Sequence, residues 1–245
     1  MKNLCISILL IILALLAACT QGNLSNHTVV IGDRSGSNED VGRSVIGVIQ
    51  QGIGHEDVRR TSRVIVLGTG DRETAFEPLV LGSFEVPVAR RVIEGRHQDD
   101  MQVEFMDSVK AALNGQFDDT TNNTPLYLAV RRGLETLSGL GCGSEEYLRT
   151  STECTLYVVT DGEETVEKRI RKALDGDGNI ELEDMVLDNA GVRVRICGYA
   201  NTNANTEMRS AVRAGRLQEV WKGLFTHPEM VIMEPFCPAY DGGEK

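Results

Sequence analysis

The chain has 245 residues, of which 41% are hydrophobic and 25% are charged. This composition is typical of a globular protein and excludes a fibrous or largely disordered chain. The formal net charge of −11 at pH 7 repels the phosphate backbone of nucleic acids, so we expect no nucleic-acid partner.

The N-terminal residues have the pattern of a secretion signal. Lys2 precedes an apolar run from Leu4 to Leu16, which is interrupted only by Ser7 and is too short to span a bilayer. The run ends in Leu-Ala-Ala followed by Cys19. An aliphatic residue, two small residues and a cysteine resemble the lipobox of bacterial lipoproteins, which implies attachment of acyl chains, such as palmitate, to Cys19. A plain secretory signal is the alternative.

Lipid attachment divides the chain into four parts. Residues 1–18 would be a removed signal peptide, 19–26 a lipidated tether, 27–237 one globular domain and 238–245 a C-terminal tail. Several acyl chains anchor a protein durably, so we expect a membrane-anchored protein of the bacterial cell envelope. In a Gram-negative source it would belong to the outer membrane or to the periplasmic face.

The expected domain alternates between strand and helix patterns. Short β-branched runs predict strands, and apolar residues at three-to-four spacing predict helices. In chain order we expect a strand at Thr28–Ile31, a helix at Glu39–Gln51, strands at Arg63–Leu67 and Leu79–Val86, a helix at Asp99–Leu113, a helix opened by Pro125, strands at Thr155–Val159 and Val192–Ile196, a helix at Glu207–Phe225 and a strand at Met230–Met233.

This order predicts an α/β fold with a doubly wound, mostly parallel sheet and helices on both faces. No helix separates Leu79–Val86 from the strand before it, so we expect this strand to pair antiparallel at one edge of the sheet. Four cysteines fall in the domain. An even number in an exported chain predicts two disulfides, for which three connectivities exist. These cysteines are Cys142, Cys154, Cys197 and Cys237.

Three polar loops meet at the carboxyl edge of the expected sheet, where ligands bind in open α/β folds. The first contains Asp33, Ser35 and Ser37, the second contains Thr124, and the third contains Asp161. Two carboxylates and three hydroxyls form an oxygen-only set that suits a hard divalent cation. Mg²⁺ is the expected ion, with Mn²⁺ or Ca²⁺ as alternatives.

The three loops resemble a known motif set. Asp-x-Ser-x-Ser, Asn-Thr-Pro-Leu-Tyr-x-Ala and Thr-Asp-Gly, in this order and on these elements, are similar to the metal-ion-dependent adhesion site of the von Willebrand factor A family. The resemblance spans about residues 28–236. The chain departs from the family in having two asparagines before Thr124, where glycines are common, which leaves Thr120 or Thr121 as alternatives to Thr124.

The resemblance implies a role for each candidate ligand. Ser35 and Ser37 would bind the cation through their hydroxyls, and Thr124 would bind it directly or through water. Asp33 and Asp161 would bind it directly or hold coordinating waters. A partner protein's acidic side chain would complete the coordination.

The implied function is metal-dependent protein binding in adhesion or assembly, with no small-molecule substrate and no enzymatic activity. One alternative is a hydrolase or phosphatase that uses Asp161. A second alternative is an envelope scaffold with a purely structural metal. No part of the sequence names the partner.

The predicted fold also limits the disulfide pairing. It places Cys142 and Cys154 at one edge of the sheet and Cys197 and Cys237 at the opposite edge. A strand of about six residues spans about 20 Å, which is too far for a bridge between the two edges. We therefore expect the bridges Cys142–Cys154 and Cys197–Cys237.

A second candidate cation site lies in an acidic insert. Residues Asp175 to Asp184 partly fit a calcium-binding loop. Ala173 would stand at the first ligand position, however, and the twelfth would be Asp184 in place of glutamate. An acidic turn is the alternative.

Overall fold

Six strands form one sheet in the order β3-β2-β1-β4-β5-β6. The computed structural model describes residues 25–34, 41–54, 61–69, 78–86, 95–118, 123–144, 153–176, 180–199 and 207–238. The strands are β1 (Ser25–Gly32), β2 (Thr61–Gly68), β3 (Leu79–Val86), β4 (Cys154–Val159), β5 (Val192–Cys197) and β6 (Val231–Glu234). The helices are α2 (Val41–Gly54), α3 (Gly95–Leu113), α4 (Leu126–Gly139), α6 (Lys168–Asp175) and α7 (Glu207–Gly223), with short 3-10 turns at η2 (Glu183–Met185) and η3 (Pro228–Met230).

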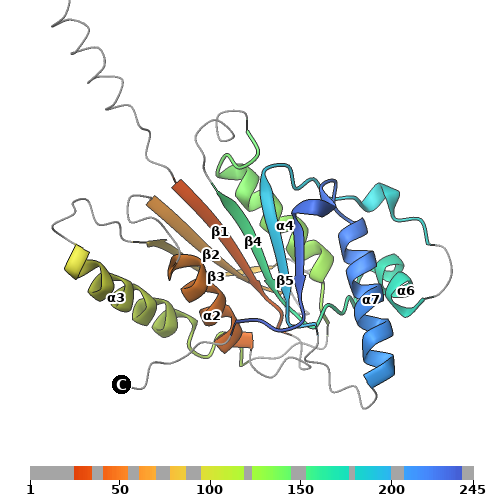
Figure 1. The fold of residues 1–245 in the computed structure, drawn as a ribbon, viewed down its shortest axis with the longest axis horizontal. Helices are drawn as coiled ribbons and strands as arrows, with labels where there is room; N and C mark the ends of the chain where they lie inside the picture. The colour runs from red at the N-terminus through yellow and green to blue at the C-terminus, as the bar shows by residue number, and fades with distance from the viewer. Residues whose placement is uncertain are drawn as a thin grey trace, which may run out of the picture.

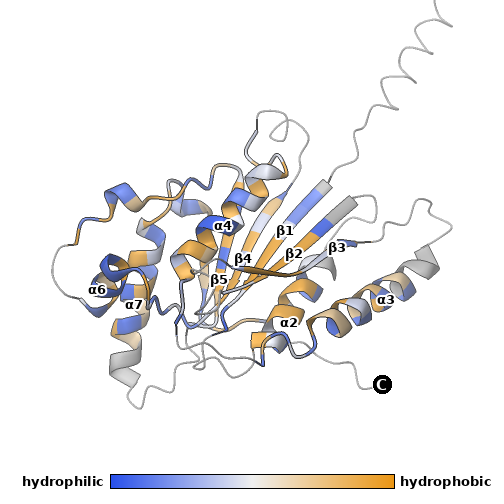
Figure 2. Ribbon diagram, turned by 180° about the vertical axis from the view of Figure 1, so that it is seen from behind, coloured by the Kyte–Doolittle hydropathy of each residue, from blue (hydrophilic) through white to orange (hydrophobic). Residues whose placement is uncertain are grey.

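The predicted fold class is confirmed. β3 pairs antiparallel with β2, and every other neighbouring pair is parallel. Helices α2 and α3 lie on one side of the sheet and α4 on the other, as Figures 1 and 2 show. Because Gly32 of β1 lies beside both Gly68 of β2 and Val159 of β4, these three strands end at a common edge.

Two hydrophobic cores enclose the sheet. Val29 and Ile31 of β1 point into the core shared with α4, α6 and α7, and Val30 points into the core shared with α2 and α3. All three side chains are fully buried. The strand is thus covered on both faces, as its uninterrupted apolar run indicates. The apolar strands appear orange in Figure 2.

Element bounds differ from the predictions mainly at the ends. β1 begins at Ser25, inside the expected tether, and α3 begins at Gly95, four residues before the predicted start at Asp99. Helix α6 was not predicted. It is short, and it is delimited by Glu167, whose side chain accepts a hydrogen bond from the Arg169 N–H, and by Gly176 in the left-handed conformation.

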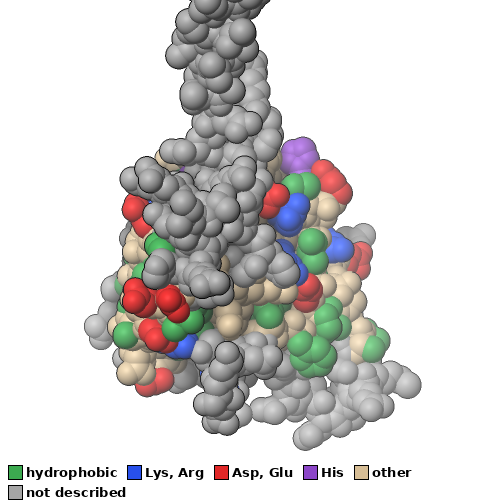
Figure 3. Space-filling view, turned by 60° about the vertical axis from the view of Figure 1, so that its left-hand side comes forward, with side chains coloured by type: hydrophobic (Ala, Val, Ile, Leu, Met, Phe, Trp, Pro, Cys, Tyr) green, Lys and Arg blue, Asp and Glu red, His purple; other side chains and the backbone are tan. Residues whose placement is uncertain are grey.

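The expected signal peptide, Cys19 and most of the expected tail lie outside the described residues. Within the described part, no helix has the length and apolarity that crossing a membrane requires. The face of the molecule in Figure 3 mixes acidic, basic and hydrophobic side chains, as globular surfaces usually do.

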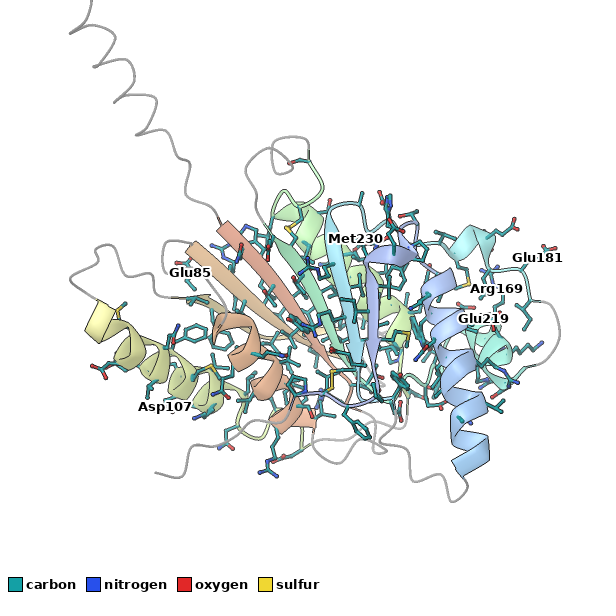
Figure 4. The ribbon with its side chains drawn as sticks, viewed as in Figure 1. Glu85, Asp107, Arg169, Glu181, Glu219 and Met230 are labelled. Atoms are coloured by element: carbon teal, nitrogen blue, oxygen red, sulfur yellow. A yellow bond between two sulfur atoms is a disulfide. The ribbon has the colours of Figure 1, made fainter. Side chains whose placement is uncertain are left out.

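Both expected disulfides are present, and Figure 4 draws their sulfur atoms in yellow. Cys142 and Cys154 have a Cα–Cα distance of 6.1 Å. Cys197 and Cys237 have a Cα–Cα distance of 4.9 Å, although 40 residues separate them in the sequence. In the chain-entropy model the first bridge stabilises the fold by about 3 kcal/mol and the second by about 4 kcal/mol.

The acidic insert is only partly described, because residues 177–179 lie outside the described segments. Asp184 accepts hydrogen bonds from the Arg169 guanidinium at 2.7 and 2.9 Å, which lowers the pKa of this carboxyl. An ion pair therefore engages the residue at the expected twelfth ligand position. This contact favours the acidic turn over the calcium loop.

Stability should fall at mildly acidic pH because of His27. This residue lies on β1 opposite Arg63 of β2, whose guanidinium also pairs with Glu85 of β3. Burial, and next the charge of Arg63, lower the pKa of His27 below its usual value of 6.5. The unfolded chain therefore takes up a proton more readily than the folded one as the pH falls through 6.5. Stability that is present above this pH is lost below it.

The test is urea unfolding at pH 7.5 and pH 5.5, with His27→Gln as the comparison. The wild type should lose more stability between the two values than the variant, because only the wild type carries the titrating imidazole. Equal losses would show that other groups cause the pH dependence.

Candidate metal centre

Two buried carboxylates stand at the carboxyl edge of neighbouring strands. Asp33 directly follows β1, and Asp161 follows β4 after one residue. The Asp33 N–H donates to the carbonyl of Val159, the last residue of β4, at 2.9 Å. Asp33 is 0% exposed and Asp161 is 1% exposed. The parallel pairing of β1 and β4 therefore brings both acids to the edge where the sequence predicted a site.

Thr160 connects the two acids, although it was quoted only as part of the Thr-Asp-Gly motif and was not among the predicted ligands. Its hydroxyl donates to Oδ2 of Asp33 at 2.7 Å and accepts from the N–H of Gly162 at 2.9 Å. The same side chain thus orients the first carboxylate and shapes the turn that carries the second. Its only signal in the sequence is its position directly before Asp161.

The turn around Asp161 is held from two directions. Oδ1 of Asp161 accepts a hydrogen bond from the N–H of Glu163 at 3.0 Å. Gly162 has a φ of +84°, which strongly favours glycine, and its carbonyl accepts from Nε1 of Trp221 on α7 at 3.0 Å. Helix α7 therefore helps to hold the turn in place through this hydrogen bond.

Thr124 reaches the same edge from the loop before α4. Its N–H donates to the Thr165 hydroxyl at 2.6 Å, and its carbonyl accepts from the Thr165 N–H at 3.2 Å. Thr165 lies four residues after Asp161, so this pair of contacts fastens the Thr124 loop to the Asp161 loop. The structure thus places the Thr124 loop beside the loop that follows Asp161, whereas Ser35 and Ser37 lie outside the described residues.

A third acid, Glu164, was missed by sequence reasoning. Its side chain is 1% exposed, and its carboxylate accepts hydrogen bonds from the N–H groups of Tyr127 at 2.7 Å, Val166 at 2.7 Å and Glu167 at 3.0 Å. Burial raises the pKa of Glu164, and the N–H donors oppose that rise. Because Tyr127 lies in the first turn of α4, this carboxylate fixes the helix start next to Thr124.

Replacing Glu164 by glutamine should therefore destabilise the fold. Oε1 accepts two N–H donors and Oε2 accepts one, so the glutamine amide must turn an N–H toward at least one of them. A buried group left without its partner costs about 1–3 kcal/mol, measurable by urea unfolding. Glu135→Gln, on the exposed side of α4, is the control and should cost less than about 1 kcal/mol. A loss in Glu164→Gln no larger than in this control would contradict the capping role.

The donor set fits a hard divalent cation. Asp33, Asp161, Thr124 and Thr160 offer only oxygen atoms at this edge, as Mg²⁺, Mn²⁺ and Ca²⁺ prefer. Nowhere in the described segments do three or more His, Cys, Asp or Glu side chains gather as metal ligands. A cation here would therefore depend on hydroxyl and water oxygens as much as on the two carboxylates.

The fold and this edge define the class of the protein as a doubly wound α/β domain. The strand order β3-β2-β1-β4-β5-β6, with helices on both faces, is that of the Rossmann-like and von Willebrand factor A-like folds. No family model and no curated protein sequence matches the chain.

Solved structures with a similar arrangement come from several sources. They include proximal thread matrix protein 1 from the mussel byssus (10% identity, 87% of this chain, 44% of that chain, TM-score 0.44). Another is the pilus adhesin SpaC of Lactobacillus rhamnosus GG (13% identity, 87% of this chain, 28% of that chain, TM-score 0.42). A third is the protein BatB of Bacteroides thetaiotaomicron (13% identity, 86% of this chain, 91% of that chain, TM-score 0.36). The chain spans less than half the length of the first two.

Proposed function

We propose that this chain is a membrane-anchored, metal-dependent protein-binding module of the bacterial cell envelope, with a role in adhesion or assembly. The observation that carries the proposal is the buried Asp33–Thr160 hydrogen bond beside Asp161, at the ligand-binding edge of the sheet. A divalent cation held there by Asp33, Thr124 and Asp161, together with the hydroxyls of Ser35 and Ser37, would keep one coordination position for a ligand from outside.

A carboxylate is the ligand that this site would prefer. Hydroxyl and water oxygens donate weakly, so they leave positive charge on the cation that an incoming carboxylate neutralises. Mg²⁺ keeps several waters in protein sites and exchanges them for carboxylate oxygens. An Asp or Glu side chain of a partner protein would therefore bind in the open position.

The test combines a defined probe with partner capture. Mn²⁺ binding to the full chain is followed by electron paramagnetic resonance, and acetate is then added as a minimal carboxylate. We expect acetate to displace water from the bound Mn²⁺. A partner from envelope extracts should be captured in Mg²⁺ but not in chelator, and acetate should compete with this partner for the site. The variant Asp33→Ala should lose both the cation and the partner. A partner held equally well in chelator would favour the scaffold alternative.

The hydrolase alternative fits the geometry less well. It requires a second acid two residues after Asp161, which is Glu163 in this chain. The Glu163 carboxylate accepts hydrogen bonds from the Arg213 guanidinium, so a cation of the protein itself engages it. Phosphatase activity that is abolished by Asp161→Asn but kept by Ser35→Ala would reverse this conclusion.

The membrane anchor is a separate part of the proposal and depends on Cys19. In cells fed labelled palmitate, the chain should take up label and sediment with membranes. Cys19→Ser should take up none and should appear in the soluble exported fraction. Retention of the label in this variant would contradict lipid attachment at Cys19.

A further inference from the structure

One disulfide lies next to the candidate metal centre. Cys197 ends β5, and its bridge to Cys237 folds the segment after β6 back over the end of β5. Cys197 lies beside Val159 of β4 in the parallel register, one residue before Thr160. The bridge therefore lies at the carboxyl edge, while the Cys142–Cys154 bridge lies at the opposite end of β4.

A short chain of contacts leads from this bridge to the first carboxylate. The carbonyl of Cys197 accepts a hydrogen bond from the Thr160 N–H at 2.9 Å. The hydroxyl of Thr160 in turn donates to Oδ2 of Asp33 at 2.7 Å. Only one residue, Thr160, thus separates the disulfide-bonded cysteine from the carboxylate.

The residue after Cys197 is Gly198, which packs tightly against Thr160 and Cys237. Gly198 has a φ of +101°, and a Cβ atom on it would lie 2.9 Å from the Thr160 carbonyl oxygen and 3.4 Å from Sγ of Cys237. Its N–H donates to the carbonyl of Glu234 at 3.2 Å, which joins β5 to the end of β6. A side chain at this position would therefore collide with the peptide of Thr160 and touch the sulfur of Cys237, because both groups pack around the place that its Cβ atom would occupy.

We infer that the Cys197–Cys237 bridge is a positioning element of the metal centre, an inference that rests on the proposed function. While the bridge is closed, the end of β5 holds Thr160 in place, and Thr160 holds Asp33 and the Asp161 turn. When the bridge opens, the segment after β6 is released from β5, and the ligands lose part of their pre-organisation. Groups that orient metal ligands typically change affinity by about 10- to 100-fold when they are altered.

The other disulfide supplies the matched control. Cys142–Cys154 lies about 20 Å away along β4, at about 3.3 Å per residue, and it makes no contact in this chain of hydrogen bonds. Its removal should lower the stability of the protein without changing its affinity for the cation. If Cys197–Cys237 had a merely structural role, opening it would likewise lower the stability without changing the affinity for the cation.

The experiment compares two redox states of one variant. In the double variant C142S/C154S, dithiothreitol can open only Cys197–Cys237 within the domain, forming its own cyclic disulfide as the two cysteines gain two electrons and two protons. Mn²⁺ affinity of the full chain in detergent is measured in the closed, opened and reoxidised forms at a temperature where circular dichroism shows all three folded. We expect about tenfold weaker binding in the opened form and full recovery on reoxidation.

Equal affinity in the closed and opened forms would overturn the inference while leaving the proposed function intact. A wild type that binds no Mn²⁺ would instead refute the proposed function. If the opened form unfolds, Thr160→Val and Thr160→Ser with both bridges closed take its place. The valine variant should bind about tenfold more weakly and the serine variant should match the wild type. Wild-type affinity in the valine variant would also overturn the inference.

Discussion

Asp33→Asn should abolish cation-dependent stabilisation while leaving the metal-free protein folded. Asp33 and Asp161 are buried, and each accepts a hydrogen bond, from the Thr160 hydroxyl and from the Glu163 N–H respectively, so contacts within the protein hold both carboxylates without a cation. The asparagine keeps a carbonyl oxygen that can accept the Thr160 hydroxyl, but it removes one of the two negative charges. The metal-free variant should therefore stay folded, whereas its affinity for a divalent cation should fall.

Added cation should separate the variant from the wild type. A ligand at 100 times its dissociation constant stabilises the folded state by about 2.7 kcal/mol if it does not bind the unfolded chain. The wild type should gain this amount in Mg²⁺, and Asp33→Asn should gain almost nothing. Urea unfolding in chelator and in saturating Mg²⁺ measures both quantities.

The control for this prediction is Asp107→Asn. Asp107 is an exposed acid on α3, labelled in Figure 4 and distant from the carboxyl edge of the sheet. This variant should respond to Mg²⁺ as the wild type does. An equal Mg²⁺ response in Asp33→Asn would exclude Asp33 as a ligand and would leave its burial to be explained by hydrogen bonding alone.

Trp221→Ala should cause the largest loss of stability in the described part of the chain. The side chain of Trp221 is 0% exposed within the core formed by the sheet, α4, α6 and α7. Truncation of a buried aromatic residue to alanine costs about 3–5 kcal/mol, which is a large share of the 5–15 kcal/mol of a typical domain. Because Trp221 is the one tryptophan in the chain, the variant has no tryptophan fluorescence to follow. Urea unfolding is therefore measured by circular dichroism.

A milder substitution separates the packing role of Trp221 from its support of the candidate metal centre. Trp221→Phe keeps an aromatic ring in the core but leaves the Gly162 carbonyl without its indole donor, at a cost of about 1–3 kcal/mol. Since Gly162 directly follows Asp161, this variant should also bind the cation more weakly. Val212→Ala, an exposed position on α7, should change stability by less than about 0.5 kcal/mol. A similarly small loss in Trp221→Ala would show that the core around α7 is loosely packed.

Local patterns in the sequence were sufficient to predict the layers of the fold. Strand runs such as Thr155–Val159 have few other ways to bury their side chains, and the absence of a helix before Leu79–Val86 required an antiparallel pair. The disulfide pairing followed from the same topology. Cysteines at opposite edges of the sheet lie a whole strand length apart, so only cysteines at the same edge can form a bridge. The expected helix start at Asp99 was too late because helix ends carry weaker signals than helix centres.

The sequence by itself thus determined the sheet, its antiparallel edge, the edge that carries Asp33 and Asp161, and the two bridges. Only the tertiary structure decided how the candidate metal centre is held together. Thr160 meets Asp33 across 127 residues, and Trp221 meets Gly162 across 59. The physical reason is that side-chain periodicity reports burial on a local face. A hydrogen bond between distant loops depends instead on how neighbouring strands align, and no single segment contains that information.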